Sequence, residues 1–154
     1  MTDLAIVTGV PGWLGSNLVQ ALLNGLPDST STAPASAGAQ VSSINPSLLK
    51  AQVRSVRALC LKGSNTTELA ELGSGLSFVN GDLASGEGLE ALTEGARGAT
   101  VFHVAGVIHP SQGRKEFYDV NFEGTKRLLT ASINAGVKRF IYVSSNSPIG
   151  CNKS

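Results

Sequence analysis

Short apolar runs alternate with segments of helical spacing along the chain. Residues 4–7 (LAIV) form a continuous apolar run that ends in a glycine-rich turn, which is typical of a strand buried on both faces. From Trp13 onward, leucine and alanine recur at helical spacing until Asn24-Gly25 provides a stop signal. The first 25 residues therefore predict a strand, a glycine turn and a helix.

The same alternation resumes at residue 53 and continues to the end of the chain. Further strands are predicted at 53–61, 76–80, 100–105 and 140–143. Helices are predicted from Asn65, which stands at capping-box spacing from Glu68, and at 89–95 and 114–135. Five strands joined by helical connections, with no hairpin signal, predict a doubly wound α/β domain with a parallel sheet.

Residues 25–52 interrupt this pattern. The segment is rich in Ser, Ala, Thr, Pro and Gly and has little apolar content, so we expect a surface insertion of low complexity within a single domain spanning 1–154. One short helix near 46–52 is the alternative, because Pro46 or Ser47 could begin a turn. Neither interpretation assigns the insertion a catalytic or binding role.

Composition narrows the class of protein. The chain has 154 residues, of which 42% are hydrophobic and 15% charged, and its formal net charge is +1. It lacks a basic block, so nucleic acid and anionic membranes are not expected partners. The N-terminus has no basic segment and only a short apolar run, which predicts a cytoplasmic protein. Cys60 and Cys151 lie far apart, and Cys60 is expected to be a small core residue.

The glycine turn carries the candidate chemistry. Gly9, Gly12 and Gly15 are spaced by three residues between a predicted strand and a predicted helix, which is the context required of a dinucleotide-binding turn. We expect Gly9 to permit the tight turn, Gly12 to let the backbone approach a pyrophosphate, and Gly15 to let helix and strand pack closely. Trp13 and Leu14 begin the helix, whose N-terminal amides would face the phosphates. A glycine turn without a ligand is the alternative.

These motifs resemble the extended short-chain dehydrogenase/reductase family, which includes the NAD-dependent epimerases and dehydratases of nucleotide sugars. The resemblance rests on five segments in the family order, namely Thr8-Gly9-x-x-Gly12-x-x-Gly15, Gly81-Asp82-Leu83, 101–106 (VFHVAG), Val120-Asn121-x-x-Gly124-Thr125 and 142–150 (YVSSNSPIG). It implies a Rossmann NAD(P)-binding fold, truncated after the fifth strand.

The resemblance also implies roles for individual residues. Asp82, with Leu83 beside it, would contact the adenine ring, and Ala105 and Gly106 would pass beside the cofactor. Asn121 would support the active-site architecture. Ser145 would be the catalytic serine, whose hydroxyl hydrogen-bonds the substrate oxygen that becomes or ceases to be a carbonyl.

The two histidines are weaker candidates. His103 lies within a predicted strand, and we expect a satisfied, partly buried side chain rather than a base. His109 follows the fourth strand at the carboxyl edge of the sheet, where such sheets bind ligands. It could therefore line the substrate-binding side of the site, although a surface loop residue is favoured.

The end of the second strand bears on cofactor choice. NAD-binding domains usually carry an acidic residue there for the ribose 2′-hydroxyl, and this chain has none. Lys62 and Ser64 could instead accommodate a 2′-phosphate, so the sequence favours NADP over NAD. The alternative is that Lys62 is a solvated loop cation.

The acid–base pair of the family is missing. Family members use a Tyr-x-x-x-Lys pair for hydride-transfer chemistry, whereas Tyr118 is followed four residues later by Phe122, and Tyr142 by Asn146. We therefore expect the NAD(P)-binding portion of an epimerase/dehydratase-like enzyme that is inactive alone. An NADPH-dependent ketone or aldehyde reductase and a non-catalytic regulatory module remain open. The implied partners are a dinucleotide and a small-molecule substrate, and the complete protein could form a homodimer.

Overall fold

The computed structural model of the chain describes residues 4–25, 53–108 and 113–144. The expectations for the insertion (26–52), His109 and Ser145 lie outside the described residues.

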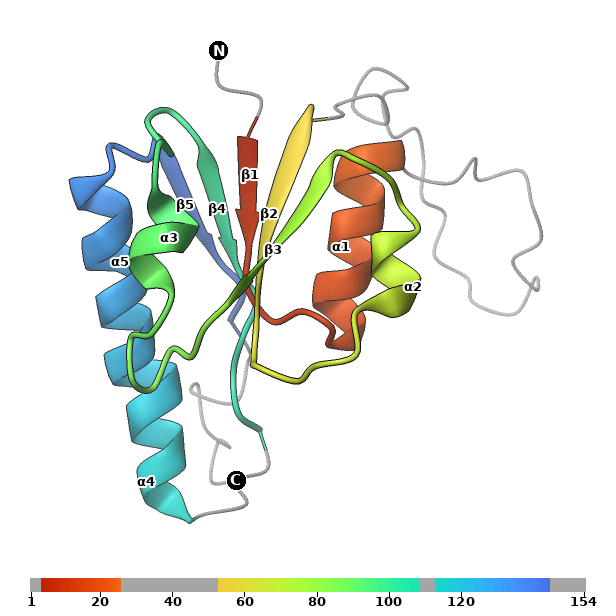
Figure 1. Cartoon of the computed structure of the whole chain (residues 1–154). Helices are drawn as coiled ribbons and strands as arrows, with labels where there is room; N and C mark the ends of the chain where they lie inside the picture. The colour runs from red at the N-terminus through yellow and green to blue at the C-terminus, as the bar shows by residue number, and fades with distance from the viewer. Residues whose placement is uncertain (1–3, 26–52, 109–112, 145–154) are drawn as a thin grey trace, which may run out of the picture.

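The fold is built on one five-stranded sheet in which every neighbouring pair is parallel (Figure 1). The strands are β1 (Leu4–Val7), β2 (Ser55–Cys60), β3 (Leu76–Asn80), β4 (Thr100–His103) and β5 (Arg139–Tyr142). Their order across the sheet is β3-β2-β1-β4-β5. This arrangement confirms the predicted doubly wound parallel sheet.

Helices cover both faces of the sheet (Figure 1). One face carries α1 (Trp13–Asn24) and α2 (Thr67–Ala70), and the other carries α3 (Leu89–Thr93) and a long helix. The long helix comprises α4 (Arg114–Phe117), a π-helical segment η1 (Tyr118–Gly124) and α5 (Thr125–Asn134). In the described part of the chain, no helix has the length and apolar character needed to cross a membrane.

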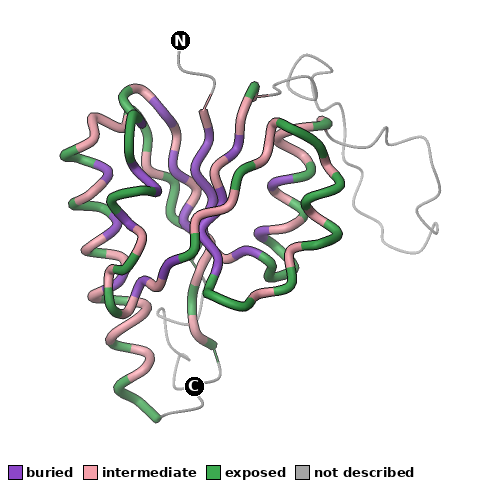
Figure 2. Tube along the Cα trace, in the orientation of Figure 1, coloured by how far each residue is buried: buried purple, intermediate pink, exposed green. Residues whose placement is uncertain are grey.

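The buried positions of β1 explain its uninterrupted apolar run. Ala5 and Val7 belong to the core beneath α1 and α2, while Ile6 belongs to the core beneath α3 and α5. All three side chains are completely buried, and β1 is coloured as buried along most of its length (Figure 2). A strand covered on both faces has no solvent side, so polar residues are not needed at alternate positions.

The start of α2 differs from the prediction. Thr66, not Asn65, is the residue that precedes the helix, and it makes no capping hydrogen bond through its side chain. The Asn65 carboxamide oxygen instead accepts a hydrogen bond from the Thr67 amide at 3.1 Å. The predicted capping box is therefore wrong, and Asn65 forms a local turn just before the helix.

The strand order creates a switch point beside β1. The chain passes from β1 outward to β2 and β3, and then returns to β4 on the opposite side of β1. The connections that follow β1 and β4 consequently leave on opposite faces of the sheet. In open α/β sheets, ligands bind outside the carboxyl ends of the strands at such a point.

Candidate functional site

A cavity of about 540 Å³ opens at the carboxyl ends of the strands. It is lined by the following residues: Gly9, Val10, Leu59, Cys60, Leu61, Gly81, Asp82, Leu83, Ala84, Ala105, Gly106, Val107, Lys115, Glu116, Asp119 and Val120. These residues end β2, follow β1, β2, β3 or β4, or lie in the first part of the long helix. The volume lies within the range of about 300–1,000 Å³ that small-molecule sites occupy.

Gly9 lies where the turn after β1 approaches the end of β4. Its φ is +84°, a region that residues with a Cβ rarely adopt. A Cβ added there would lie 2.8 Å from the backbone nitrogen of Ala105. Glycine is therefore required both by the backbone conformation and by the space, because the turn lies in direct backbone contact with the end of β4.

The other two glycines of the turn pack against Gly9. The Gly12 amide donates a hydrogen bond to the Gly9 carbonyl oxygen at 2.9 Å. A Cβ added at Gly12 or at Gly15 would lie 2.8 Å or 2.5 Å from that same oxygen. Gly15 therefore packs the start of α1 closely against the turn, rather than against the strand as expected. Gly12 is also held by contact with the turn, and its approach to a pyrophosphate stays a prediction.

Only some of the predicted cofactor residues line the cavity. Gly9, Asp82, Leu83, Ala105 and Gly106 do so, from the ends of three different strands. Gly12, Trp13, Leu14, Gly15 and Lys62 are not part of its lining. Trp13 is 81% exposed at the start of α1. The binding roles of both groups stay predictions.

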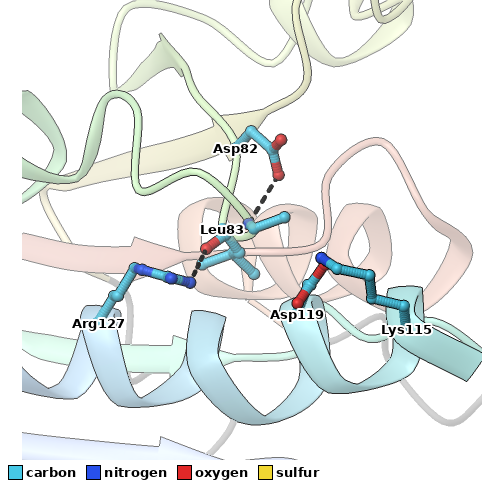
Figure 3. A network of polar contacts seen from close by, with 6 residues as sticks. Asp82, Leu83, Lys115, Asp119 and Arg127 are labelled. Carbon is cyan, nitrogen blue, oxygen red and sulfur yellow. Dashed lines mark hydrogen bonds and ion pairs between the residues drawn. The ribbon is translucent and has the colours of Figure 1, made fainter.

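The loop after β3 holds Asp82 at the cavity (Figure 3). One oxygen of its carboxylate accepts a hydrogen bond from the Ala84 amide at 2.9 Å, and its own amide donates to the Glu87 carbonyl at 3.0 Å. The Arg127 guanidinium, from α5, donates to the Leu83 carbonyl at 3.4 Å. Leu83 itself is buried in the core beneath the long helix. The loop is thus fixed by its own turn and by α5.

A buried polar chain connects β1, β4 and the long helix behind the cavity. The Thr125 hydroxyl donates to the Asn121 carbonyl at 2.8 Å, so it can only accept from the His103 ring at Nε2, also 2.8 Å away. His103 then carries its proton on Nε2, and its Nδ1 accepts from the Thr8 hydroxyl. The Thr8 oxygen in turn accepts from the amides of Val104 and Ala105 at 3.2 and 3.1 Å. Every member of the chain is satisfied.

His103 is therefore a structural residue, as expected from the sequence, and it is more deeply buried than expected. Its side chain is completely inaccessible to solvent. Burial lowers the pKa of His103 from about 6.5 to about 4, because desolvation penalises the charged ring. The ring is neutral at physiological pH and does not act as a base.

Asn121 fixes the segment that follows β4. Its carboxamide oxygen accepts from the Val107 amide at 2.8 Å, and its nitrogen donates to the Val107 carbonyl at 2.9 Å. Both backbone groups of Val107 are held by one side chain of the π-helical segment. These two bonds hold the segment after β4, and the role of Asn121 in an active site stays a prediction.

The long helix contributes charged residues to the cavity that no sequence motif indicates. Lys115, Glu116 and Asp119 line the cavity, and Lys115 forms an ion pair with Asp119 (Figure 3). Charged residues at a spacing of four are common on solvated helix faces, so the sequence contains no signal that this face meets a cavity.

Cys60 is buried, as expected for a core residue, and it also reaches the cavity. Burial raises the pKa of its thiol, which keeps the side chain protonated. Within residues 4–25, 53–108 and 113–144, no three His, Cys, Asp or Glu side chains gather in an arrangement that could hold a metal ion.

Comparisons with known proteins agree with this architecture. A protein of Sinorhizobium fredii is 38% identical over 97% of the chain and 36% of its own length. A 3-beta-hydroxysteroid dehydrogenase of Mycolicibacterium neoaurum is 32% identical over 96% of the chain and 34% of its own length. The crystal structure of the Bordetella bronchiseptica enzyme WbmG in complex with NAD superposes with a TM-score of 0.61 at 20% identity, over 90% of the chain and 36% of the enzyme.

The chain spans about a third of the length of each of these proteins. The likeness to WbmG concerns the fold, because its identity is low. Residues 5–154 match the model of a protein family described as the NAD dependent epimerase/dehydratase family. With its glycine turn at the switch point of a five-stranded parallel sheet, the chain belongs to the NAD-dependent epimerase/dehydratase family.

Proposed function

We propose that this chain binds NAD or NADP in the cavity at the carboxyl ends of β1 to β4, as the cofactor-binding part of an enzyme that interconverts alcohol and carbonyl groups. The observation that carries the proposal is the close packing at Gly9. A Cβ there would clash with the backbone of Ala105, so the glycine brings the turn after β1 directly against the end of β4 at the switch point, where both border the cavity.

Different residues of the cavity suit different parts of a dinucleotide. The turn at Gly9 leads into α1, whose N-terminal amides and dipole favour phosphate groups. Asp82 and Leu83, after β3, would contact the adenine, as the family resemblance implies. Ala105 and Gly106, after β4, would pass beside the cofactor.

The reaction class follows from the family and from one residue. The nicotinamide supplies a hydride acceptor or donor when the cofactor is bound. Ser145, which lies outside the described residues, would donate a hydrogen bond to the substrate oxygen and stabilise the charge that develops there. The hydroxysteroid dehydrogenase among the relatives favours oxidation of a ring alcohol, while the matched family also favours epimerase or dehydratase chemistry.

The turn after β2 favours NADP. The Ser64 amide donates to the Leu61 carbonyl at 3.0 Å, which closes a turn with Lys62 exposed next to Leu61, a residue of the cavity wall. We propose that Lys62 and Ser64 receive a 2′-phosphate just outside the cavity, with charge and hydrogen bonds supplied by these side chains.

Calorimetric titration of the chain with NAD and with NADP tests the proposal. We expect both to bind, NADP more tightly, and Gly9→Ala to weaken both at least tenfold. Gly95→Ala is the matched control, because Gly95 also has a positive φ but has open space around it and lies outside the cavity. Failure of both dinucleotides to bind would contradict the proposal. Equal loss of binding in the two variants would show that backbone strain, rather than the site, explains the effect.

Two further measurements separate the finer claims. Lys62→Met should abolish the preference for NADP, whereas Lys126→Met, an exposed lysine on α5, should preserve it. We also propose that residues 1–154 alone bind cofactor without turnover, because the sequence has no Tyr-x-x-x-Lys pair. Cofactor-dependent oxidation or epimerisation by this polypeptide would overturn that claim.

A further inference from the structure

The long helix carries apolar side chains on its outer side as well as on the side that packs on the sheet. Its buried side includes Gly124, Leu128 and Ser132. The outer side chains form a set that we call the outer stripe, whose members are between 40% and 67% exposed: Tyr118, Phe122, Leu129 and Ile133. A surface helix normally has one apolar stripe, with polar residues opposite. The core of this chain therefore does not explain the outer stripe.

The spacing of these residues places them along one side of the helix. Tyr118 and Phe122 lie four residues apart, and their rings stack with centroids 5.0 Å apart. Leu129 and Ile133 have the same spacing on α5. Phe122 precedes Leu129 by seven residues, which is about two helical turns. The outer stripe is therefore continuous and extends over about 22 Å.

The outer stripe is symmetric about the middle of the helix. The end pair, Tyr118 and Ile133, and the inner pair, Phe122 and Leu129, have the same midpoint, between residues 125 and 126. When a second copy of the helix is turned end over end about this midpoint, Tyr118 meets the partner's Ile133 and Phe122 meets the partner's Leu129. Each contact then occurs twice. A two-fold interface requires this kind of self-complementary surface.

Two charged residues near the midpoint complement each other in the same arrangement. Lys126 is exposed, and Glu123 is half-buried and accepts a hydrogen bond from the Tyr118 hydroxyl at 3.3 Å. In the antiparallel pair, Lys126 lies within about one helical turn of the partner's Glu123 along the axis. A parallel pair in register would instead bring like charges together, which is repulsive. The charges therefore favour the antiparallel arrangement.

We propose that the outer stripe binds a second copy of the chain as an antiparallel helix pair, with its two-fold axis between residues 125 and 126. Exposed apolar patches of this kind mark interfaces between proteins. None of the four residues belongs to the described lining of the cavity, so the pairing does not depend on the proposed dinucleotide binding. The stripe is short, and the dimer dissociates on dilution, as small interfaces do.

Sedimentation equilibrium of the 154-residue chain at several concentrations tests the pairing. We expect a reversible equilibrium between monomer and dimer. Phe122→Glu should weaken the dimer at least tenfold, because it places a carboxylate against the partner's Leu129. Ile108→Glu is the matched control, since Ile108 is also an exposed apolar residue but lies outside the helix. It should leave the association unchanged.

Reversal of the two charges tests the register. Glu123→Lys and Lys126→Glu should each weaken the dimer about fivefold, because each variant brings like charges together across the two-fold axis. The double variant brings opposite charges together again and should restore the association of the wild-type chain. Single variants that associate as the wild type does, or a double variant no stronger than the single ones, would show that the register is wrong.

The remaining outcomes also decide the matter. A wild-type chain that stays monomeric would overturn the proposal, and the outer stripe would then be left for another occupant, such as the additional chain of the longer relatives. Association that Phe122→Glu does not weaken would overturn it too, because another surface would be responsible. Dimers of a chain that binds no dinucleotide would support this inference and contradict only the proposed function. Thermal unfolding of each variant verifies that the fold is retained.

Discussion

The hydroxyl of Thr8 lies 2.8 Å from Nδ1 of His103, and both side chains are completely buried. This contact joins the last residue before the glycine turn to the last residue of β4. Because the Thr8 oxygen also accepts the amides of Val104 and Ala105, it fixes the two backbone segments that border the switch point. The cavity wall at Gly9 and Ala105 thus depends on a polar contact behind it.

The stability of the fold should fall as pH falls below about 6.5. The pKa of His103 is lowered to about 4 in the folded chain, so the unfolded chain binds more protons between these values. Above the unfolded pKa of about 6.5, the neutral His103 ring costs the folded chain nothing. As the pH falls to 4, the free energy of unfolding decreases by about 3 kcal/mol, because the unfolded chain takes up a proton more readily than the folded chain. Urea unfolding at pH 7 and pH 4 measures this difference. His103→Gln should have a smaller pH dependence, and an unchanged slope would contradict the assignment.

Removing the Thr8 hydroxyl should destabilise the protein. Thr8→Val leaves the amides of Val104 and Ala105 and the His103 ring without their shared partner, at a cost of about 2–3 kcal/mol. Thr8→Ser keeps the hydroxyl and should recover most of that loss. Urea unfolding at pH 7 compares the three proteins, and equal stability of the Val and Ser variants would rule out the network as described.

Gly15→Ala should destabilise a helix in which alanine is normally favourable. Replacing glycine by alanine in a helix interior usually stabilises it by about 1 kcal/mol. At this position the new Cβ would lie 2.5 Å from the Gly9 carbonyl oxygen, so the turn must move. The melting temperature should fall, whereas Gln20→Ala on the exposed side of α1 should leave it nearly unchanged. A rise in melting temperature for Gly15→Ala would refute the close packing.

Asn121→Asp should weaken both stability and dinucleotide affinity. The carboxylate can still accept from the Val107 amide, but it repels the Val107 carbonyl to which the carboxamide donates. We expect a loss of about 1–3 kcal/mol in the free energy of unfolding. Asn17→Asp is the matched control, because Asn17 also donates to a backbone carbonyl but at an exposed site. Similar losses in both variants would show that the Val107 clamp has no special role.

The sheet and the order of elements could be predicted from the sequence because each strand is a compact apolar run between polar or glycine-rich segments. The predicted strands at 4–7 and 76–80 coincide with β1 and β3. The π-helical segment at Tyr118–Gly124 was not foreseen, because apolar spacing over so short a stretch does not separate it from an ordinary helix. The place of Asn65 was misjudged because spacing alone does not show which residue leaves the helical conformation.

The candidate site was predicted where a motif constrains the backbone, as at Gly9, Asp82 and Gly106. It was missed where the long helix brings distant side chains to the cavity. Lys115 and Asp119 lie more than thirty residues from Asp82 in the sequence. They line the same cavity as Asp82 because the long helix packs over Leu83. Such a contact is a property of the packing and leaves no local pattern.

Mapping the backbone amides of the isotopically labelled chain by nuclear magnetic resonance, with and without NAD or NADP, tests the central claim most directly. We predict that shifts gather at Gly9, Asp82, Leu83, Ala105 and Gly106, the predicted residues that line the cavity. Residues of the groove between α3 and α5, such as Glu90 and Asn134, should stay unchanged. Shifts confined to that groove, or no shifts at all with either dinucleotide, would contradict the assignment of this cavity as the dinucleotide site.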